Sequence, residues 1–507
     1  MSSATLLNQD DLKRWRHCPR HFWLHRHGHA ARMAPHTRLA DEALAQHSWP
    51  DQALRASFPE SVVIDEPHTD DDWDRAISQT QHLLNDGYLI GMHTDGEGEG
   101  RAIFGACLAS NDGARVRIDV LTTGSHGLRL FRVRYATIGD DADVDTAALW
   151  THVAARCGLR VQSAGLLLID TDFTYPGHGC YAGLFREADL SPVLGSRTIP
   201  NWLVAMRTCE RTEQPEVQPD ARCAAHGGCD FTAHCGAPEP ASKATHHASL
   251  DIVGRELAQA LRSEGHTDLM TVPEQRMPDA RRRRALRAVQ SGLPELDADI
   301  AQAMNLPYPR HTLRFDTIGF ATPIWPGTRP YQVLPFQWTC DTEVAPGQLL
   351  RQRFLADKEG DPRRAFAESL LQAVGHEGPV IAYNAGFERN RMRELALLFE
   401  DLATDLEVLM TRVVDLFQIA RAHYYHPAQC GSWSFKAMCR AIAPDLRADQ
   451  FEWAGETAAQ VAFARSQQER LDDATAQTLR AALIDHGHRQ TEALRRLVAC
   501  FEHTTRP

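Results

Sequence analysis

The stretch LRFDTIGF, residues 313–320, alternates like a β-strand and runs into the turn-rich segment ATPIWPGTRPYQVLPFQW. Side chains two positions apart on a strand point to the same face, so Arg314 and Asp316 share one side and Phe315 lies on the other. A polar pair on one face of an otherwise apolar strand predicts a first strand that carries a functional site. We expect the C-terminal part of the chain to be organised around this strand.

The sequence after this strand alternates between expected strands and helices. We expect strands at 336–340 and 379–383, the strand-like RVVDLF, and helices at 362–374, 388–399 and 472–501. An antiparallel start followed by alternating strands and helices is typical of ribonuclease-H-like sheets. Asn384 and Glu388 fall at a strand-to-helix turn of this pattern.

Length and composition set the class of protein. A chain of 507 residues is too long for one ordinary core, so we expect two domains with a connector. Its 43% hydrophobic and 24% charged residues are typical of a soluble globular protein. No run is long enough to span a bilayer and the N-terminus has no signal-peptide core, so we expect a cytoplasmic protein without a membrane role. The net charge of -12 argues against indiscriminate coating of nucleic acid but is compatible with a local basic groove.

The N-terminal segment 10–29, DDLKRWRHCPRHFWLHRHGH, predicts a helix. It mixes arginines with Trp15, Phe22 and Trp23, a combination that suits a phosphate backbone and unstacked bases. An amphipathic helix that buries its aromatic residues and exposes a basic face explains the same pattern. Cys18 lies in this segment, far from the other cysteines.

Residues 102–170 predict an α/β core with three strands, a helix near 147–156 and a further strand. Asp119 lies on one strand, and Arg132 and Arg134 share a face of the next. Three polar side chains that converge from adjacent strands indicate a second candidate site.

Twelve cysteines in a large cytosolic chain argue for metal or iron–sulfur ligation and against a disulfide framework. Cys223, Cys229 and Cys235 recur with five residues between them in a loop rich in Gly and His. Three cysteines lack one ligand for a tetrahedral or cubane site, and Cys18 can supply it. Zinc, with His226 or His234 as substitute ligands, remains an alternative to an iron–sulfur cluster.

Residues 241–306 read as a polar linker followed by mostly helical sequence that contains four consecutive arginines, 281–284. Four adjacent residues point in every direction around a helix, so some of these arginines must be solvated. The pattern favours a charge-compensating surface over a nucleic-acid contact.

Four blocks of sequence together resemble a known family: CPRHFWL, IGFATPIWPGTRPYQVLPFQW, YNAGFERNRMRELA and VVDLFQIARAHYYHPAQCGSWSFKAM. The chain is similar to a bacterial family known only as a domain of unknown function (number 2779), whose members join a RecB-like nuclease domain of the PD-(D/E)XK type to a DnaQ-like 3′–5′ exonuclease domain. The resemblance covers nearly the whole chain. It implies a PD-(D/E)XK restriction-endonuclease-like domain at 1–240, a helical linker at 241–306 and a ribonuclease-H-like exonuclease domain at 307–507. DNA is the expected nucleic-acid partner.

The resemblance also gives the cysteines a role. In similar RecB-like nucleases, one N-terminal and three C-terminal cysteines hold a [4Fe-4S] cluster that joins the ends of the domain. The positions match Cys18, Cys223, Cys229 and Cys235 in this sequence.

The expected exonuclease carboxylates are only partly present. DnaQ-like enzymes use an Asp-x-Glu pair, a third acid and a final Asp to hold two divalent ions, magnesium or manganese. On this chain the first Asp falls on Arg314, the Glu on Asp316, the third acid on Glu388 and the final Asp on Gln490. His486 stands four residues before Gln490, where the family has His or Tyr. A register shifted by two would leave Ile318 in the second position and would not restore the set.

The N-terminal domain departs in the same way. A PD-(D/E)XK nuclease needs an Asp and, on the next strand, Glu-x-Lys. Asp119 fits the Asp, but Arg132-Val133-Arg134 stands at the Glu-x-Lys position. Arg134 replaces the lysine charge imperfectly, and Arg132 cannot ligate a metal.

Three functions follow from these departures. The first is a nucleic-acid-binding pseudo-nuclease in which Arg132, Arg134 and Arg314 contact phosphates. The second is an active exonuclease with a rearranged set: Asp316, Glu388, Asp415 and Asp485 with His486 or His488 as the base. The third is a scaffold that uses both folds for assembly with a protein partner.

Overall fold

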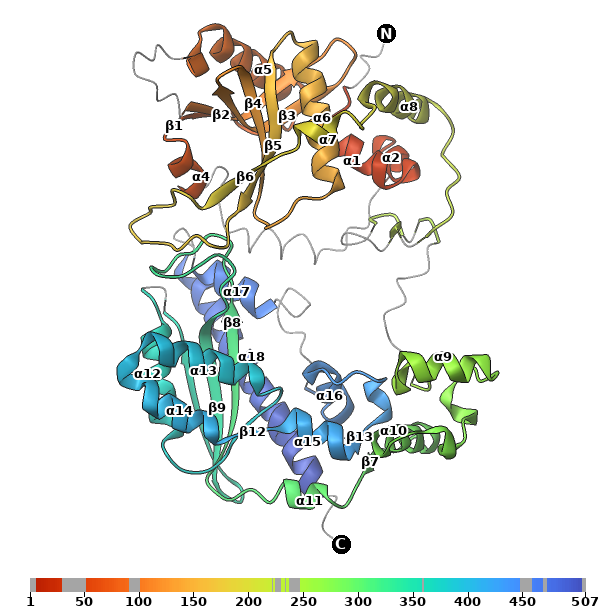
Figure 1. Cartoon of the computed structure of the whole chain (residues 1–507), viewed down its shortest axis with the longest axis vertical. Coiled ribbons are helices and arrows are strands. Elements are labelled where there is room, and N and C mark those ends of the chain that lie inside the picture. Colours follow the sequence, from red (N-terminus) through yellow and green to blue (C-terminus); the bar gives the residue numbers. More distant parts are fainter. Residues whose placement is uncertain are drawn as a thin grey trace. The chain divides into compact units, whose positions relative to one another are not determined.

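The computed structural model describes residues 6–29, 52–90, 101–220, 222–223, 229–232, 234–236, 247–357, 360–446, 458–467 and 472–503. The chain divides into two compact units, Met1–Pro240 with Phe320–Gln332, and Ala241–Gly319 with Val333–Pro507. Each unit combines a β-sheet with helices (Figure 1), which confirms the mixed α/β class. None of the described helices is both long and apolar enough to cross a bilayer.

The first unit contains a six-stranded sheet in the order β1-β2-β3-β4-β5-β6. The strands β2, β3 and β4 form an antiparallel meander, β5 is parallel to β4, and β6 is antiparallel to β5. The strands are β1 (Glu60–Val63), β2 (Arg101–Ala109), β3 (Arg115–Gly124), β4 (Gly127–Arg134), β5 (Val161–Ile169) and β6 (Phe185–Asp189). The helices are α1 (Gln9–His17), α2 (Pro19–Arg26), α4 (Gln52–Ser57), α5 (Asp70–Asn85), α6 (Asp141–Arg156), α7 (Ser191–Leu194) and α8 (Ile199–Arg211).

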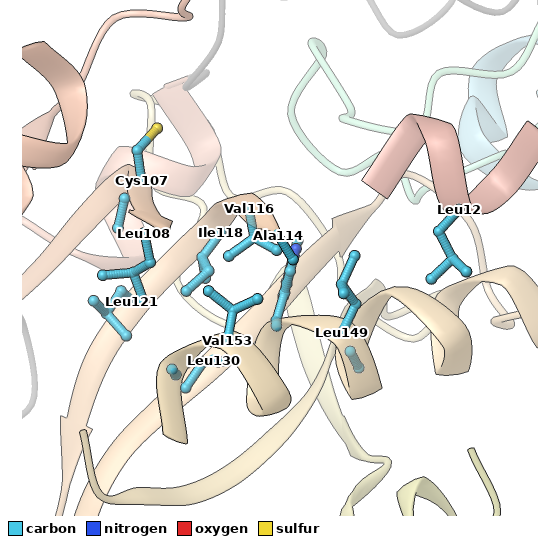
Figure 2. Close-up of a cluster of buried hydrophobic side chains, with 14 of the residues drawn as sticks. Leu12, Cys107, Leu108, Ala114, Val116, Ile118, Leu121, Leu130, Leu149 and Val153 are labelled. Atoms are coloured by element: carbon cyan, nitrogen blue, oxygen red, sulfur yellow. The ribbon is translucent and has the colours of Figure 1, made fainter. Parts of the chain in front are cut away.

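The main core of this unit lies between the sheet and α6. Figure 2 shows Leu149 and Val153 of α6 facing the strand residues Ile118 and Leu130, with Leu12 of α1 at one end. The helix α6 begins at residue 141, six residues before the predicted start. The reason is a capping box in which the Asp140 side chain accepts from the Asp143 amide and the Asp143 side chain accepts from the Asp140 amide.

The single helix predicted at 10–29 is two helices, α1 and α2, separated at Cys18. Pro19 has no amide hydrogen and forces its predecessor out of the helical region, and Cys18 is extended, with φ -164° and ψ 124°. Asn8 caps α1 by accepting from the amides of Asp10 and Asp11. The break places Cys18 at the corner between two helices, where its side chain is only partly buried.

The second unit contains a five-stranded sheet in the order β10-β9-β8-β11-β12. The strands β8, β9 and β10 are antiparallel neighbours, whereas β11 is parallel to both β8 and β12. The strands are β8 (Arg310–Ile318), β9 (Leu334–Ala345), β10 (Gln348–Leu355), β11 (Val380–Ala382) and β12 (Val413–Asp415). Among these, β10 was not predicted, because QLLRQRFL is half exposed and lacks clean alternation.

The two faces of this sheet differ in polarity. Leu313, Phe315 and Trp338 point to an apolar core built with α12 (Arg363–Val374), α13 (Gly386–Leu398) and α14 (Ala403–Thr411). The other face is polar and lies against α18 (Asp473–His503), which packs on β8 and β9. Strand β8 therefore presents Arg314 and Asp316 to this second, polar face.

The region expected to be a linker, 241–306, is folded onto the second unit. It contains α9 (Arg255–Ser263), α10 (Ala280–Ser291), α11 (Ile300–Ala303) and β7 (Glu295–Leu296), and β7 pairs with β13 (Tyr424–Tyr425). The remaining helices of this unit are α15 (Leu416–His423), α16 (Phe435–Ile442) and α17 (Ala458–Ser466).

The segment between β8 and β9, Phe320–Gln332, belongs to the first unit. The Tyr175 amide donates to the Thr328 carbonyl at 2.9 Å, and the Tyr181 hydroxyl donates to the Pro323 carbonyl at 3.1 Å. The indole of Trp325 is buried. The WPGTRPYQ sequence is therefore a packed part of the first unit and not an exposed loop of the sheet in the second unit.

Candidate functional site

Arg314 lies at the centre of the polar group on the α18 side of β8. Its Nε donates to Gln490 Oε1 at 3.0 Å, and its Nη1 lies 3.4 Å from Glu388 Oε1 and 3.3 Å from the Tyr383 carbonyl. The guanidinium also covers the ring of Phe435, with 4.8 Å to the ring centroid. Only 19% of the Arg314 side chain is exposed. The cation is therefore committed to neighbours within the unit.

Asp316 is connected to Arg314 through Gln490 and does not pair with it directly. The Gln490 amide donates to Asp316 Oδ1 at 3.3 Å while its carbonyl oxygen accepts from Arg314. His486, one turn earlier on α18, places Nε2 3.7 Å from the same Asp316 oxygen. Gln490 thus bridges the cation and the carboxylate.

Glu388 is the most buried acid of this group, with 1% of its side chain exposed. Burial raises the pKa of Glu388 to about 7, the Arg314 guanidinium opposes the rise, and the Asp415 and Asp316 carboxylates add to it. Among the described residues, Glu388 Oε2 has no hydrogen-bond partner. The structure therefore connects Glu388 to Arg314 directly and Asp316 to Arg314 through Gln490, while Asp415 lies close enough to Glu388 to raise its pKa.

Asp415 also has a local structural role. Its carboxylate accepts from the amides of Phe417 and Asn384, both at 3.0 Å, so it caps α15 and holds the turn before α13. Asn384 has a positive φ of 62°, a conformation that asparagine tolerates better than most residues. This turn points Glu388 at the polar face.

Asp485, the other predicted acid, takes part in a different contact. Its carboxylate lies 2.6 Å from Arg489 one turn later on α18, and about half of its side chain is exposed. Within the described part of the chain, no hydrogen bond or ion pair joins Asp485 to Arg314 or Glu388. His488 lies on the same helix beside Asp341, whose charge opposes the lowering of the His488 pKa by burial.

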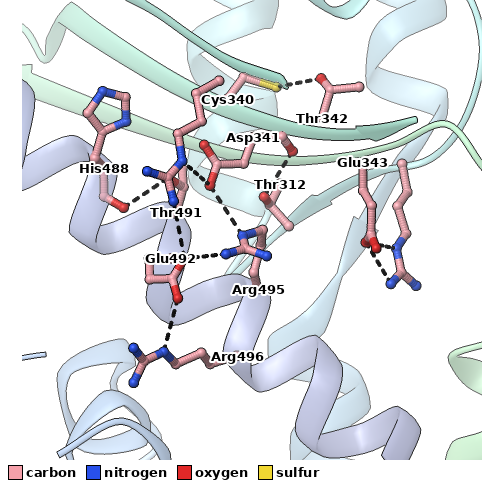
Figure 3. Close-up of polar contacts among 12 residues, drawn as sticks. Thr312, Cys340, Asp341, Thr342, Glu343, His488, Thr491, Glu492, Arg495 and Arg496 are labelled. Atoms are coloured by element: carbon pink, nitrogen blue, oxygen red, sulfur yellow. Dashed lines mark hydrogen bonds and ion pairs between the residues drawn. The ribbon is translucent and has the colours of Figure 1, made fainter. Parts of the chain in front are cut away.

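The polar face continues along β9 into a dense charge network. Figure 3 shows Asp341 of β9 facing Arg495 of α18, with 3.3 Å between Asp341 Oδ2 and Arg495 Nε. Glu492 pairs with Arg495 and Arg496, and it lies 3.5 Å from Arg351 of β10. Burial raises the pKa of Asp341, and the nearby arginines oppose the rise. Ion pairs therefore join α18 to β9 and β10 at this part of the sheet.

The candidate site of the first unit also combines a buried acid with arginines that pair with neighbouring carboxylates. Asp119 accepts from the Val133 amide at 3.0 Å, and burial raises its pKa while Arg132 opposes the rise. Arg132 Nε lies 3.1 Å from Asp143, and Arg134 lies 3.5 Å from both Asp140 and Asp143. Asp143 is fully buried, and its position at the start of α6 was not predicted because the helix was expected to begin later. The two arginines are thus paired with acids of their own unit.

All four predicted ligand cysteines line one cavity. Cys18 comes from the corner between α1 and α2, and Cys223, Cys229 and Cys235 come from the loop after α8. Backbone bonds hold this loop: the Cys229 amide donates to the Cys223 carbonyl at 2.8 Å and the Cys235 amide to the Phe231 carbonyl at 2.9 Å. The four cysteines line the same cavity although about 200 residues of sequence separate the first from the others.

The cysteine side chains fit a metal group as a donor set. Burial raises the pKa of Cys229 and of Cys235, and neighbouring thiols, Cys18 and Cys223 among them, raise both further. Gathered thiols resist deprotonation until a cation is present, and four thiolates are the ligand set of a cubane cluster or of tetrahedral zinc. His234 is exposed and meets His29 edge-on, while His226 lies outside the described residues.

Two further histidines on this cavity were not singled out from the sequence. His17 and His21 line it, and together with Cys229 they offer ligand atoms that all lie within 4.8 Å of one another. Their signal was the motif HCPRH, in which both histidines flank Cys18.

The fold and its sites define a mixed α/β protein of two units, with arginine-filled acidic sites and a four-cysteine cavity. Residues 311–434 match the model of a family described as a domain of unknown function, DUF2779. This region contains Arg314, Asp316, Glu388 and Asp415, whereas Gln490, His486 and the whole cysteine cavity lie outside it. Neither a curated protein nor a solved structure matches the chain.

Proposed function

We propose that this protein is a nucleic-acid-binding pseudo-nuclease, built from a PD-(D/E)XK-type unit and a ribonuclease-H-like unit that have lost metal-dependent hydrolysis. The strand orders support these two assignments. In the first unit an antiparallel meander leads through α6 to a parallel strand, with Asp119 on its second strand and Arg132 on its third. In the second, antiparallel β8, β9 and β10 precede parallel β11 and β12.

The observation that carries the proposal is the position of the Arg314 guanidinium among Glu388, Gln490 and Asp316. Two-metal hydrolysis needs carboxylates that converge on cations, which then activate water and stabilise the leaving oxygen. A fixed guanidinium supplies a positive charge to the same acids but has no open coordination position. It also repels a divalent ion from the space beside it.

The arginines differ in how readily they can meet a phosphate. Arg314 is largely buried, stacked on Phe435 and bonded to three groups. Arg134 is about one third exposed, and both of its carboxylate contacts are long, at 3.5 Å. A phosphate can form shorter, bidentate bonds with such an arginine. We therefore assign the nucleic-acid contact to the Arg134 side of the first unit, and a structural role to Arg314.

A cluster in the four-cysteine cavity belongs to the same proposal. The donor set fits a [4Fe-4S] cluster, which Cys18, Cys223, Cys229 and Cys235 would hold. Its role here is structural, since it joins the N-terminal helices to the loop after α8. When bound, it supplies a covalent tie and no hydrolytic chemistry.

Hydrolysis is tested by incubating the purified chain with end-labelled single- and double-stranded DNA and RNA in magnesium and in manganese. We expect no cleavage. The double variant Arg314→Asp with Gln490→Asp restores the acid positions, so it should gain divalent-ion binding in calorimetry that the native chain lacks. Arg353→Asp, an exposed arginine on β10, is the control for the loss of a positive charge. Native cleavage that Asp316→Asn or Glu388→Gln abolishes would establish the rearranged exonuclease instead.

Binding is tested by fluorescence anisotropy with the same oligonucleotides over a salt series. Arg134→Gln should weaken binding and reduce the slope of log K against log salt by about 1, as expected for the loss of one phosphate contact. Arg129→Gln is the matched control because Arg129 lies on the same strand but on its opposite face. If the native chain binds no oligonucleotide at moderate salt, the protein-assembly function replaces this one.

A further inference from the structure

His17 and His21 bring a second kind of ligand to the cysteine cavity. His17 is the last residue of α1 and His21 lies in the first turn of α2, so the break at Pro19 sets both imidazoles on the cavity wall. Their ring centroids are 5.5 Å apart. The ligand atoms of His17, His21 and Cys229 all lie within 4.8 Å of one another.

The His21 ring is half-buried, and one of its nitrogens lacks a hydrogen bond among the described residues. Its edge meets Phe231, with 5.4 Å between the ring centroids. Nδ1 of His21 is buried and has no hydrogen-bond partner among the described residues. A buried polar nitrogen without a hydrogen-bond partner is unfavourable, and coordination of a metal ion would satisfy it. This unsatisfied nitrogen therefore indicates that His21 binds a metal ion in this cavity.

We propose that this cavity has a second metal-binding mode, in which a single zinc ion is held by His17, His21 and Cys229. A fourth position is filled by water or by another thiol of the cavity. Tetrahedral zinc binds nitrogen at about 2.0–2.1 Å and sulfur at about 2.3 Å, which separates its ligand atoms by roughly 3.3–3.8 Å. In the structure the three ligand atoms lie within 4.8 Å of one another, and they would move closer together on binding the ion.

Zinc and the cluster exclude one another, because Cys229 belongs to both ligand sets. The zinc mode is therefore a property of the chain when it carries no cluster. It does not depend on the proposed pseudo-nuclease function, since a chain without zinc binding would still be tested for cleavage and for oligonucleotide binding as above.

The experiment uses the full chain, freed of metal by a chelator and titrated anaerobically with Co²⁺ as a spectroscopic substitute for zinc. We expect one equivalent to bind with a thiolate-to-cobalt charge-transfer band and the intense visible bands of tetrahedral cobalt. His17→Asn and His21→Asn each remove a proposed metal ligand and should weaken binding by more than roughly a hundredfold, because losing only the hydrogen-bond partner of a ligand already costs roughly 10–100-fold. His25→Asn, an exposed histidine on α2, is the matched control and should bind as the native chain does.

A second measurement needs no variant and so does not depend on how well the substituted chains fold. X-ray absorption of the zinc-loaded native chain should fit a shell of mixed nitrogen and sulfur. A shell of sulfur alone overturns the proposal. So does a titration in which both histidine variants bind Co²⁺ as tightly as the native chain, or in which cobalt binds without a thiolate band.

Discussion

Arg314 and Glu388 face each other on the polar side of β8. The carboxylate is almost completely buried, and burial raises the pKa of Glu388 to about 7 in spite of the guanidinium 3.4 Å away. Desolvation of the charged form therefore outweighs the ion pair, as is common for buried acids. In a metal-binding carboxylate the attraction to nearby cations must outweigh desolvation, because only the ionised form is a ligand for magnesium.

The pKa of Glu388 predicts a pH-dependent stability. Folding raises the pKa of Glu388 above its ordinary value of 4.5, so the stabilisation that the protonated carboxyl gives is fully present below about pH 4.5 and is lost as the pH rises through about 7. The free energy of unfolding should therefore be lower by about 3 kcal/mol at pH 8 than below pH 4.5 because of this one group. Glu388→Gln should remove this decline, so its free energy of unfolding should fall less steeply between pH 5 and pH 8 than that of the native chain.

The measurement is urea unfolding across that pH range. Glu368→Gln, on an exposed carboxylate of α12, controls for the removal of one acid from the same unit. Parallel profiles for native chain and Glu388→Gln would contradict the prediction and indicate that Glu388 is ionised in the folded state at all pH values measured.

At the scale of elements, the contact between α18 and the sheet is unusually close at Gly487. This glycine lies in the middle of the helix, between His486 and His488. A Cβ atom there would lie 2.2 Å from Thr339 Oγ1 and 2.4 Å from Gln337 Nε2. Both strand residues are buried, and the Gln337 amide donates to the Leu483 carbonyl at 2.8 Å. The absence of a side chain at this position is what brings Gln490 within reach of Arg314 and Asp316.

Gly487→Ala should therefore destabilise the protein although alanine is the better helix former. The helix propensity favours alanine by about 1 kcal/mol. Forcing a methyl group into a filled space costs about 1–3 kcal/mol, so we expect a net loss of about 1 kcal/mol, measured as a lower urea midpoint. In Gly386→Ala, on α13, the new Cβ meets no atom within 4 Å, and its stability should be unchanged or slightly higher. A stable Gly487→Ala chain would mean that α18 lies farther from β9.

At the scale of the whole molecule, the two units share one arrangement of charged side chains. In each, an arginine on a sheet strand lies beside an acid at the start of a helix: Asp143 on α6 and Glu388 on α13. The first unit additionally gathers its distant N-terminal helices and its C-terminal loop around four cysteines. A group bound there would close a loop of roughly 200 residues and stabilise the unit by restricting the unfolded chain.

Cys18→Ala should abolish the cluster, because Cys18 is the one ligand that comes from the N-terminal helices. We expect iron and acid-labile sulfide to fall to background, and the thermal midpoint to fall by roughly 4–8 °C if about 2 kcal/mol of stability is lost. Cys157→Ala removes an exposed thiol outside the cavity and should change neither quantity. Iron content equal to the native level in Cys18→Ala would exclude Cys18 as a ligand.

Much of the second unit could be predicted from sequence because its elements are long and regular. The alternation in LRFDTIGF predicts which side chains of β8 face the site, and Arg314 and Asp316 do share the polar face. The predicted helices at 362–374 and 472–501 agree with α12 and α18 to within one or two residues. Local periodicity carries this information, since it depends only on the burial of one face.

The sequence could not show which of several similar residues is buried or paired when their surroundings differ only in the folded structure. Arg281 to Arg284 read as one charge run, yet Arg284 alone is buried, with its guanidinium on Asp297 and on the Ala422 carbonyl. The helix start at Asp140 was missed because a capping box is a pair of short-range hydrogen bonds between common residues. Asp485 and Gln490 are close neighbours on α18, but only the rotation of that helix decides which of them meets Asp316.

The sequence by itself determined the kind of chemistry that the chain has available: thiols at four positions, and cations where two sets of carboxylates would be expected. These are covalent facts that no fold can alter. Only the tertiary structure decided what each charge does. Arg314, Arg132 and Arg134 turn toward acids of their own units, because a buried charge is stable only when a partner replaces the water it has lost. Glu388 lies 74 residues further along the chain than Arg314, whereas Asp140 and Asp143 follow Arg132 and Arg134 closely at the start of α6.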